Sequence, residues 1–252
     1  MPALNQAELV LVHSPLTGDL IWQPVADALR ARGRTVSVPR LAGAFDSSTG
    51  PYYPGLLDAV TGRLTAPLDE TRPATVVLAG HGGAGPLLPA LRERLTQGRR
   101  PLRRVAGTVY VDAQWPHPGA SRLEAAPPQL ARQLRELAEN GSLPPWDTWF
   151  PEQMLIDEVP DPVLRERFRT GLPRLPLAYF EERAPHAVPD SDHARTAYLR
   201  LSPHYEETAM RAEAIGHRVL RRTSHHLSPL TDPEATADAL EKLARRFVTC
   251  PA

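Results

Sequence analysis

A glycine-rich turn in the stretch Val76–Gly85, which reads VVLAGHGGAG, is the part of this sequence whose residue types and spacing suggest chemistry most directly. An apolar strand pattern runs into the turn, and a helix pattern begins near Pro86. Gly80, Gly82 and Gly85 fit G-x-G-x-x-G, the turn that holds the phosphates of a dinucleotide. The turn also fits G-x-S-x-G, which exposes a nucleophilic serine, with Gly82 in the serine position. It therefore indicates either a dinucleotide site or a nucleophile turn without its nucleophile.

The rest of the chain favours the nucleophile turn. A dinucleotide fold places its glycine turn after the first strand, with an acidic residue about 20 residues further on. Here two strand–helix patterns precede the turn, although Asp112 does follow Gly85 by 27 residues. A nucleophile turn instead requires a histidine after the last strand, and the C-terminal TSHHL stretch supplies His225 and His226. A second turn, at residues 13–18, follows the first strand pattern and can form another wall of such a site.

Apolar runs and helical periodicities alternate along most of the chain and predict the elements that must position these residues. We expect strands at residues 8–14, 35–41, 74–80, 105–113, 197–202 and 217–223, and helices at residues 18–32, 54–64, 86–96, 206–215 and 232–247. Such alternation predicts an α/β fold, a mostly parallel sheet covered by helices on both faces. Residues 114–193 interrupt it with a Pro- and Trp-rich stretch that has helical patches at 128–139 and 163–169. We expect this stretch to be a lid inserted after the fourth strand of a single domain, residues 1–252.

Composition and charge make several classes of function improbable. The 29 Lys and Arg residues balance 29 Asp and Glu residues, which gives no electrostatic reason to expect nucleic acid or an anionic membrane as a partner. The lone Cys250 rules out an internal disulfide or a cysteine-built metal site. His186, His193 and His204 lack metal-ligand spacing with carboxylates. With no signal-peptide pattern and no run long enough to span a membrane, we expect a cytoplasmic protein without metal or cofactor.

Over nearly its whole length the sequence resembles the α/β-hydrolase-fold superfamily. The resemblance rests on the segments LVLVHSPLTGDLIWQPVADALRARG, VVLAGHGGAGPLLPAL, VYVDAQWPHPG and TSHHLSPLTDPEATADAL. It implies that fold, with His225 as the catalytic histidine and His226 as the alternative. It also implies that Gly82 stands at the nucleophile position and that the N–H of Gly83 is one oxyanion donor. Asp112 stands where some members of the superfamily carry the acid that orients the histidine.

The sequence departs from the hydrolase pattern at three positions. Gly82 keeps the turn but has no side chain with which to attack a carbonyl carbon. Pro15 stands where the second oxyanion donor is expected, and proline has no backbone N–H. The LSPHY stretch at residues 201–205 has no acid after the penultimate strand, which leaves Asp112 as the nearest substitute. Loss of a triad serine lowers the rate about a millionfold, and loss of an oxyanion donor costs about 3 kcal/mol more. We therefore expect a serine-less, non-hydrolytic member of the superfamily.

A pocket beneath the lid is expected to collect the candidate site residues. His225 and Asp112 form the candidate catalytic pair, although His225 could instead pack at the lid and Asp112 could cap a helix or hold an arginine. The candidate substrate-binding residues are Ser14, Pro15, Gly82, Gly83, Trp115, Trp146, Trp149 and Phe150. Aromatic side chains are more often core than pocket, but a short, Pro-rich lid favours the pocket. His81 is expected to be structural, whereas His13 is as readily structural as part of the pocket.

The residues that remain suit an enzyme that moves a proton at a carbon next to a carbonyl group, as an epimerase or isomerase does. A histidine base contributes about 10²–10⁴ in rate, which is enough for an acidic C–H. Serine-less proteins of this fold include the peptide epimerase branch of bottromycin biosynthesis, which this chain resembles. That resemblance implies a tailoring enzyme of natural-product biosynthesis that acts on a small molecule or a modified peptide. In that branch the substrate's own carboxylate can serve as base, so either His225 or the substrate takes the proton.

Two other functions stay open at this point. One is a pseudo-hydrolase that binds a ligand without turnover. Tight binding of a ligand that undergoes no chemical change would support it. The other is a weak hydrolase in which His225 and Asp112 activate water directly, which ester turnover dependent on His225 would select.

We predict that the protein hydrolyses p-nitrophenyl esters at a rate near the uncatalysed background, because Gly82 and Pro15 remove the nucleophile and one oxyanion donor. Fluorophosphonate probes, which label activated serines, should leave the pocket unlabelled in peptide mass spectrometry. Stoichiometric labelling of a pocket serine would contradict the prediction.

Overall fold

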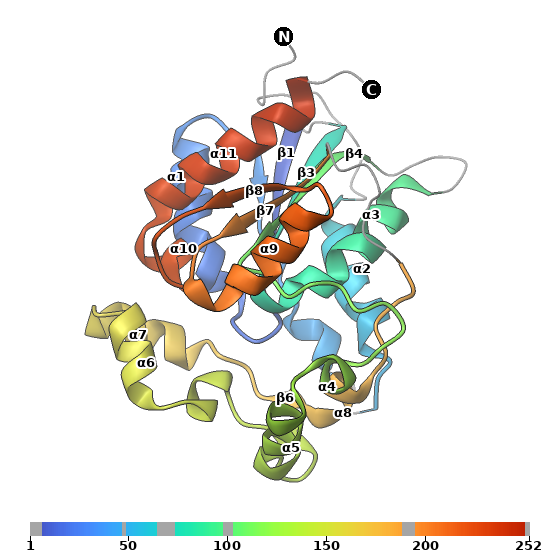
Figure 1. Ribbon diagram of the computed structural model, residues 1–252, viewed down its shortest axis with the longest axis vertical. Helices are drawn as coiled ribbons and strands as arrows, with labels where there is room; N and C mark the ends of the chain where they lie inside the picture. Colours follow the sequence, from blue (N-terminus) through green and yellow to red (C-terminus); the bar gives the residue numbers. More distant parts are fainter. Residues whose placement is uncertain (1–6, 47–48, 65–73, 98–102, 188–194, 250–252) are drawn as a thin grey trace.

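The six predicted strands are present in the computed structural model, and they form one parallel sheet (Figure 1). The structure describes residues 7–46, 49–64, 74–97, 103–187 and 195–249. The strands are β1 (Ala7–Val12), β2 (Val36–Ser37), β3 (Thr75–His81), β4 (Arg104–Val111), β7 (Thr196–Arg200) and β8 (Arg218–Arg221). Their order across the sheet is β2-β1-β3-β4-β7-β8, and each neighbouring pair is parallel. The predicted strand at 35–41 is shortened to β2, at one edge of the sheet.

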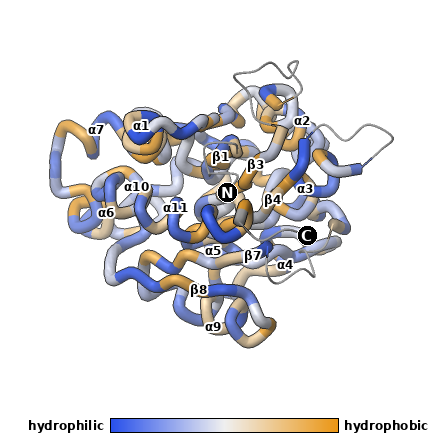
Figure 2. The backbone as a smooth tube through the Cα atoms, turned by 90° about the horizontal axis from the view of Figure 1, so that it is seen from above, coloured by the Kyte–Doolittle hydropathy of each residue, from blue (hydrophilic) through white to orange (hydrophobic). Residues whose placement is uncertain are grey.

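Helices cover both faces of the sheet, as the alternation predicted. They are η2 (Asp19–Trp22), α1 (Gln23–Ala31), η3 (Ala42–Phe45), α2 (Tyr52–Leu64), η4 (Gly82–Leu87), α3 (Leu88–Thr96), η7 (Pro203–Tyr205), α9 (Glu206–Ala214), α10 (Ser228–Thr231) and α11 (Pro233–Thr249). Helices α1 and α11 pack on one face, and α2, α3 and α9 pack on the other. In Figure 2 the central strands lie between α1 on one side and α2 and α3 on the other.

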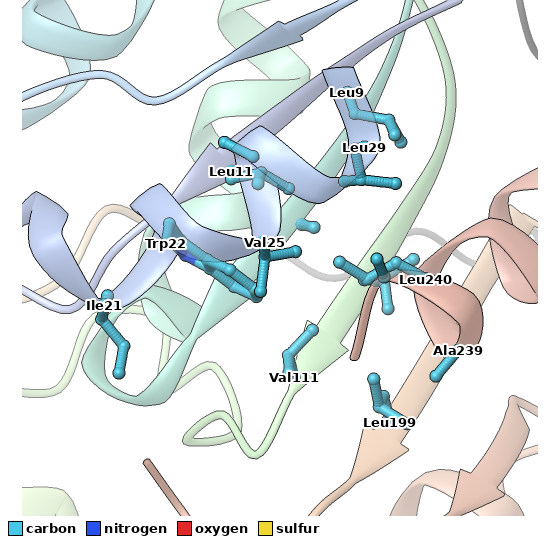
Figure 3. Packing of buried hydrophobic residues seen from close by; sticks show 14 of the residues in the cluster. Leu9, Leu11, Ile21, Trp22, Val25, Leu29, Val111, Leu199, Ala239 and Leu240 are labelled. Carbon is cyan, nitrogen blue, oxygen red and sulfur yellow. The ribbon is translucent and has the colours of Figure 1, made fainter. Parts of the chain in front are cut away.

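The apolar run of β3 explains why both faces are covered. Val77 and Ala79 belong to the core beneath α1 and α11, whereas Val76 and Leu78 belong to the core beneath α2 and α3. Successive side chains of a strand point to opposite faces, so an uninterrupted apolar strand needs a helical layer on each side. Figure 3 shows the first of these cores, where side chains of β1, α1, β4 and α11 pack together.

The segment between β4 and β7, residues 114–187, lies beyond the carboxyl ends of the strands (Figure 1). We call it the lid. Its elements are α4 (Arg122–Ala125), α5 (Pro128–Leu137), β5 (Ser142–Leu143), η5 (Trp146–Trp149), α6 (Glu152–Glu158), α7 (Pro162–Thr170), β6 (Leu175–Pro176) and α8 (Leu177–Glu181). Helices α5 and α7 were predicted. Helices α4, α6 and α8 have only four to seven residues, too few for a periodicity to show. Residues 188–193 of the predicted insertion lie outside the described residues.

The beginning of the lid passes directly over the turn that follows β3. Gln114 N donates a 3.0 Å hydrogen bond to Gly82 O. A Cβ atom on Gly85 would overlap the backbone oxygen of Gln114, so only glycine permits this approach. Gly85 therefore serves backbone packing between the turn and the lid.

Among the described residues, no helix combines the length and the apolar character that crossing a bilayer requires.

Candidate active site

The carboxyl ends of β1, β3 and β4 lie side by side, and the loops that leave them carry Ser14, Gly82 and Asp112. The chain leaves β1 toward β2 and leaves β3 toward β4, on opposite sides of the β1–β3 pair. Loops that diverge between adjacent parallel strands open a crevice, and this is where α/β sheets bind ligands. The topology therefore places Ser14 and Gly82 at a binding crevice.

Asp112 is fully buried at the end of β4. Its carboxylate accepts hydrogen bonds from Leu201 N (2.6 Å), Ser202 N (3.0 Å) and Ser202 Oγ (2.6 Å), and its Oδ2 lies 3.2 Å from His226 Nδ1. Burial acts to raise the pKa of Asp112, but the hydrogen bonds from His226, Ser202 and Leu201 lower it below the ordinary value. Its φ of 41° is costly for a residue with a side chain. The backbone is thus strained where it directs an ionised carboxylate at the histidine.

His226 is the histidine beside Asp112. A carboxylate can only accept, so Nδ1 of His226 carries a proton, and in the neutral form of the ring the lone pair is then on Nε2. The ring is stacked between His81 and Tyr205, with centroid distances of 4.3 and 5.1 Å. Nε2 lies 3.3 Å from the position that a Cβ on Gly82 would occupy. A basic nitrogen is therefore directed at the glycine turn.

The prediction that His225 pairs with Asp112 is wrong, and the alternative, His226, has that position. His225 Nε2 lies 3.1 Å from Thr231 Oγ1, and its Nδ1 lies 3.6 Å from Glu158. Adjacent residues of the loop after β8 direct their side chains differently, and these contacts turn His225 away from Asp112.

Two further histidines hold backbone in place near the site. His81 is fully buried, and its Nε2 lies 2.9 Å from His226 O. Burial, together with the neighbouring His226, lowers the pKa of His81 to about 3. The ring nitrogens of His13 are within hydrogen-bond distance of Ser14 O (2.7 Å) and Leu41 N (3.3 Å), and burial lowers the pKa of His13 as well. Both rings are therefore neutral structural groups, as was expected for His81.

The turn after β3 leaves little room for side chains at Gly82 and Gly83. Gly82 has a φ of 55°, a left-handed conformation that glycine adopts freely. A Cβ on Gly83 would lie 2.7 Å from Ser14 Oγ and 3.0 Å from Arg122 Nη1. The serine hydroxyl and the guanidinium are thus packed directly against the Gly83 backbone.

The loop after β1 presents few free amides to the turn. Pro15 has no N–H, and the next amide, Leu16 N, donates to Ser14 Oγ at 3.1 Å. Pro15 itself is buried and, contrary to prediction, is not among the described residues that line the cavity.

A cavity of about 600 Å³ lies between the lid and these loops. Its wall includes seven of the predicted site residues: Ser14, Gly82, Gly83, Trp115, Trp146, Trp149 and Phe150. His226 and Tyr205 line the cavity as well, whereas Asp112 and His225 do not. The predicted aromatic lining is thus present, and Asp112 reaches the cavity only through His226.

One carboxylate of the lid contacts the histidine loop. Glu158, at the end of α6, lines the cavity and accepts a 3.0 Å hydrogen bond from Leu227 N. This amide follows His226 directly in the chain. The lid therefore helps to hold the loop that positions His226.

Sequence reasoning missed Arg122 and Tyr205 as site residues. Tyr205 stands in the LSPHY stretch, which has no acid and whose pattern does not indicate an aromatic wall for the site. Arg122 follows Ser121 in S-R-L-E, where Ser121 Oγ accepts from Glu124 N and Glu124 accepts from Ser121 N. This capping-box spacing could have indicated a short helix at the lid entrance. Among the described residues, no cluster of three or more His, Cys, Asp or Glu could hold a metal ion.

We predict that His81 makes the protein less stable in mild acid. Its pKa is lowered from 6.5 to about 3, so the unfolded chain takes up a proton below pH 6.5 while the folded protein stays neutral. The contribution of His81 to the free energy of unfolding is therefore fully present above pH 6.5 and is lost progressively as the pH is lowered toward 3. Between about pH 7.5 and about pH 5 the loss from this group is about 2 kcal/mol.

Urea unfolding at both pH values checks this with His81→Gln. The variant should lose about 2 kcal/mol less than the wild type over the same interval. His13 and the other titrating groups remain in both proteins and serve as the internal control. Equal losses in the two proteins would show that His81 does not produce the acid sensitivity.

The sequence pattern of the alpha/beta hydrolase family matches residues 9–239. Among curated proteins no sequence matches. An extracellular alpha/beta-hydrolase from a Paenibacillus species is similar in structure, with a TM-score of 0.70 and 18% identity over 95% of this chain and 99% of that one. Tomato methylketone synthase I has a TM-score of 0.67 and 12% identity over 96% and 98% of the two chains. For polyneuridine aldehyde esterase the values are 0.64 and 16% over 95% and 99%. With its parallel sheet, its glycine turn and its matched length, this chain belongs to the alpha/beta hydrolase family.

Proposed function

We propose that this protein is a non-hydrolytic enzyme that moves a proton at a carbon next to a carbonyl group, as an epimerase or isomerase. The observation that carries the proposal is the position of His226. Its Nε2, oriented by Asp112, is directed at Gly82, where a hydrolase of this fold would carry its nucleophile. A base without a nucleophile to activate is free to take a proton from the substrate.

The proton transfer itself requires few groups. His226 Nε2 removes the proton from the acidic carbon, and the electron pair of the C–H bond moves into the carbonyl group to give an enolate. Asp112 stabilises the imidazolium that forms, and the stacked rings of His81 and Tyr205 hold its orientation. Protonation of the enolate on its opposite face, by a solvent proton or by His226 after the enolate has turned over in the pocket, gives the epimer, and protonation at another atom gives an isomer. Where solvent supplies that proton, the imidazolium of His226 loses its own proton to solvent, which regenerates the base. A positioned base of this kind contributes about 10²–10⁴ in rate.

Hydrolysis is disfavoured by the same loops. An ester needs a nucleophile at residue 82 and two donors for its oxyanion, of which Gly83 N–H can be one. Pro15 offers no donor, and the amide of Leu16 is bonded to Ser14 Oγ. An enolate oxygen carries less localised charge than a tetrahedral oxyanion, so one amide donor suits it better.

The cavity supports a substrate of moderate size with apolar parts. Its volume of about 600 Å³ and its tryptophans suit a small molecule or one residue of a modified peptide and its neighbours. Tomato methylketone synthase I, similar in fold, was crystallised with β-ketoheptanoate; the carbon between the two carbonyl groups of that acid is acidic. We propose that the substrate of the present chain likewise has an acidic carbon next to a carbonyl group. We also propose a role in natural-product tailoring, which the resemblance to the peptide epimerase branch implies.

Deuterium exchange tests the proposal. Candidate carbonyl compounds and modified peptides are incubated with the protein in D2O, and mass spectrometry follows the gain of one deuteron without cleavage. We predict that His226→Ala slows exchange by about 10²-fold or more. His225→Ala, which removes the adjacent ring but leaves the contact with Asp112, should exchange at nearly the wild-type rate.

Other outcomes separate the alternatives. If exchange survives in His226→Ala but is lost when the substrate's neighbouring carboxylate is amidated, the substrate supplies the base. Tight binding without exchange in any compound would favour a pseudo-hydrolase. Cleavage that depends on His226 would favour a water-activating hydrolase.

We also predict that a serine restored at the turn does not restore hydrolysis. In Gly82→Ser the new side chain would point at His226 Nε2, but it would fill the space above the turn and strain a backbone with a φ of 55° by about 1–3 kcal/mol. The second oxyanion donor would still be missing. Substrate binding should weaken, and p-nitrophenyl ester turnover should equal that of Gly82→Ala, which carries the same strain without the hydroxyl. Ester turnover in Gly82→Ser alone, well above that control, would overturn this account.

A further inference from the structure

Arg122 is a buried cation in the wall of the cavity. Its side chain lines the cavity although the residue is only 7% exposed. One nitrogen, Nη1, donates to Gly83 O at 3.2 Å. Within the part of the chain that the structure describes, no Asp or Glu lies within ion-pair distance of the guanidinium. The guanidinium also interacts with the hydroxyl of Tyr179. Because a guanidinium has five N–H groups, donors remain for a further partner.

The guanidinium is held rigidly. It lies over the rings of Tyr179 and Phe180, with its carbon 5.8 and 5.5 Å from their centroids. Arg122 is the first residue of α4, whose start is fixed by the reciprocal hydrogen bonds of Ser121 and Glu124. These contacts fix the charge in place before any ligand arrives, which reduces the entropy lost on binding.

The carboxylates near Arg122 are engaged elsewhere. Glu124 accepts from Ser121 N at 2.7 Å and pairs with Arg183 at 3.1 Å. Glu158, which shares the cavity wall, accepts from Leu227 N at 3.0 Å. An unpaired buried charge is costly, and an anionic ligand would remove this cost. A carboxylate matches the planar fork of a guanidinium with two parallel hydrogen bonds.

The position of the guanidinium relates it to the base. Its Nη1 and Nη2 lie 3.0 and 3.1 Å from where a Cβ on Gly83 would stand, and His226 Nε2 lies 3.3 Å from the corresponding position on Gly82. The cation and the base therefore contact neighbouring residues of one turn. A ligand anchored at Arg122 presents atoms only a few bonds away to His226.

We propose that Arg122 binds a carboxylate of the substrate, so that this pocket takes carboxylic acids whose acidic C–H lies close to that carboxylate. The proposal deepens the proposed function and rests on this cavity being the substrate site. It assigns to Arg122 the recognition of charge and leaves proton transfer to His226.

Equilibrium binding of a matched pair of probes tests it. Phenylacetate and phenylacetamide differ only in the charged group and fit the aromatic cavity. Quenching of tryptophan fluorescence, to which Trp115, Trp146 and Trp149 of the cavity wall contribute, reports binding without turnover. We expect the wild type to bind the acid at least about tenfold more tightly than the amide. Arg122→Met should abolish this preference, and Arg122→Lys should keep part of it.

Arg132→Met is the matched control, because Arg132 is an exposed arginine of α5 in the same lid and is not among the residues that line the cavity. It should keep the preference for the acid. Equal binding of acid and amide by the wild type, absence of saturable acid binding, or an undiminished preference in Arg122→Met would overturn the proposal. If Arg122→Met does not fold, Arg122→Lys takes its place in the test. An undiminished preference of Arg122→Lys for the acid over the amide would then overturn the proposal. His226→Ala should keep the preference while losing deuterium exchange, so the two proposals can fail separately.

Discussion

One buried carboxylate fixes the arrangement on which this site depends. Asp112 leaves β4 in a strained conformation and accepts hydrogen bonds from the loop after β7 as well as contacting His226 from the loop after β8. A buried carboxylate that lost these partners would cost several kcal/mol, so three chain segments are held together at one point. Without that constraint His226 would lose the contact that orients its ring toward the glycine turn.

The paired histidine and carboxylate do not by themselves select a reaction. They provide an oriented base, and the groups opposite that base decide what it acts on. Here a side-chain-free turn, a proline in the facing loop and a buried guanidinium surround it. Under the proposed function, these features disfavour a covalent intermediate and leave room and charge for an anionic substrate. Membership of the fold does not by itself fix the reaction, and the proposed function rests on these groups of the site.

The sheet and its two helical layers could be predicted because apolar strand patterns alternate with helical periods along the chain, except where the lid follows β4. Side-chain directions within loops could not. His225 and His226 stand side by side in the sequence, and only their contacts in space distinguish them. His225 contacts Thr231 and Glu158, whereas His226 contacts Asp112. Arg122 lies in a helix of only four residues, which is too short to show an apolar periodicity in the sequence. Its burial comes from Tyr179 and Phe180, more than fifty residues later in the chain, a distance that local patterns do not bridge.

The hydrogen bond from Leu227 N to Glu158 has a thermodynamic consequence for access to the pocket. Glu158 belongs to α6 of the lid, whereas Leu227 follows the histidine. Movement of α6 away from the sheet removes the acceptor of that amide, and the histidine loop loses one of its restraints. Linkage is reciprocal, so a ligand that secures His226 also favours the closed lid. Under the proposed function, substrate entry and the ordering of His226 are therefore coupled through this hydrogen bond.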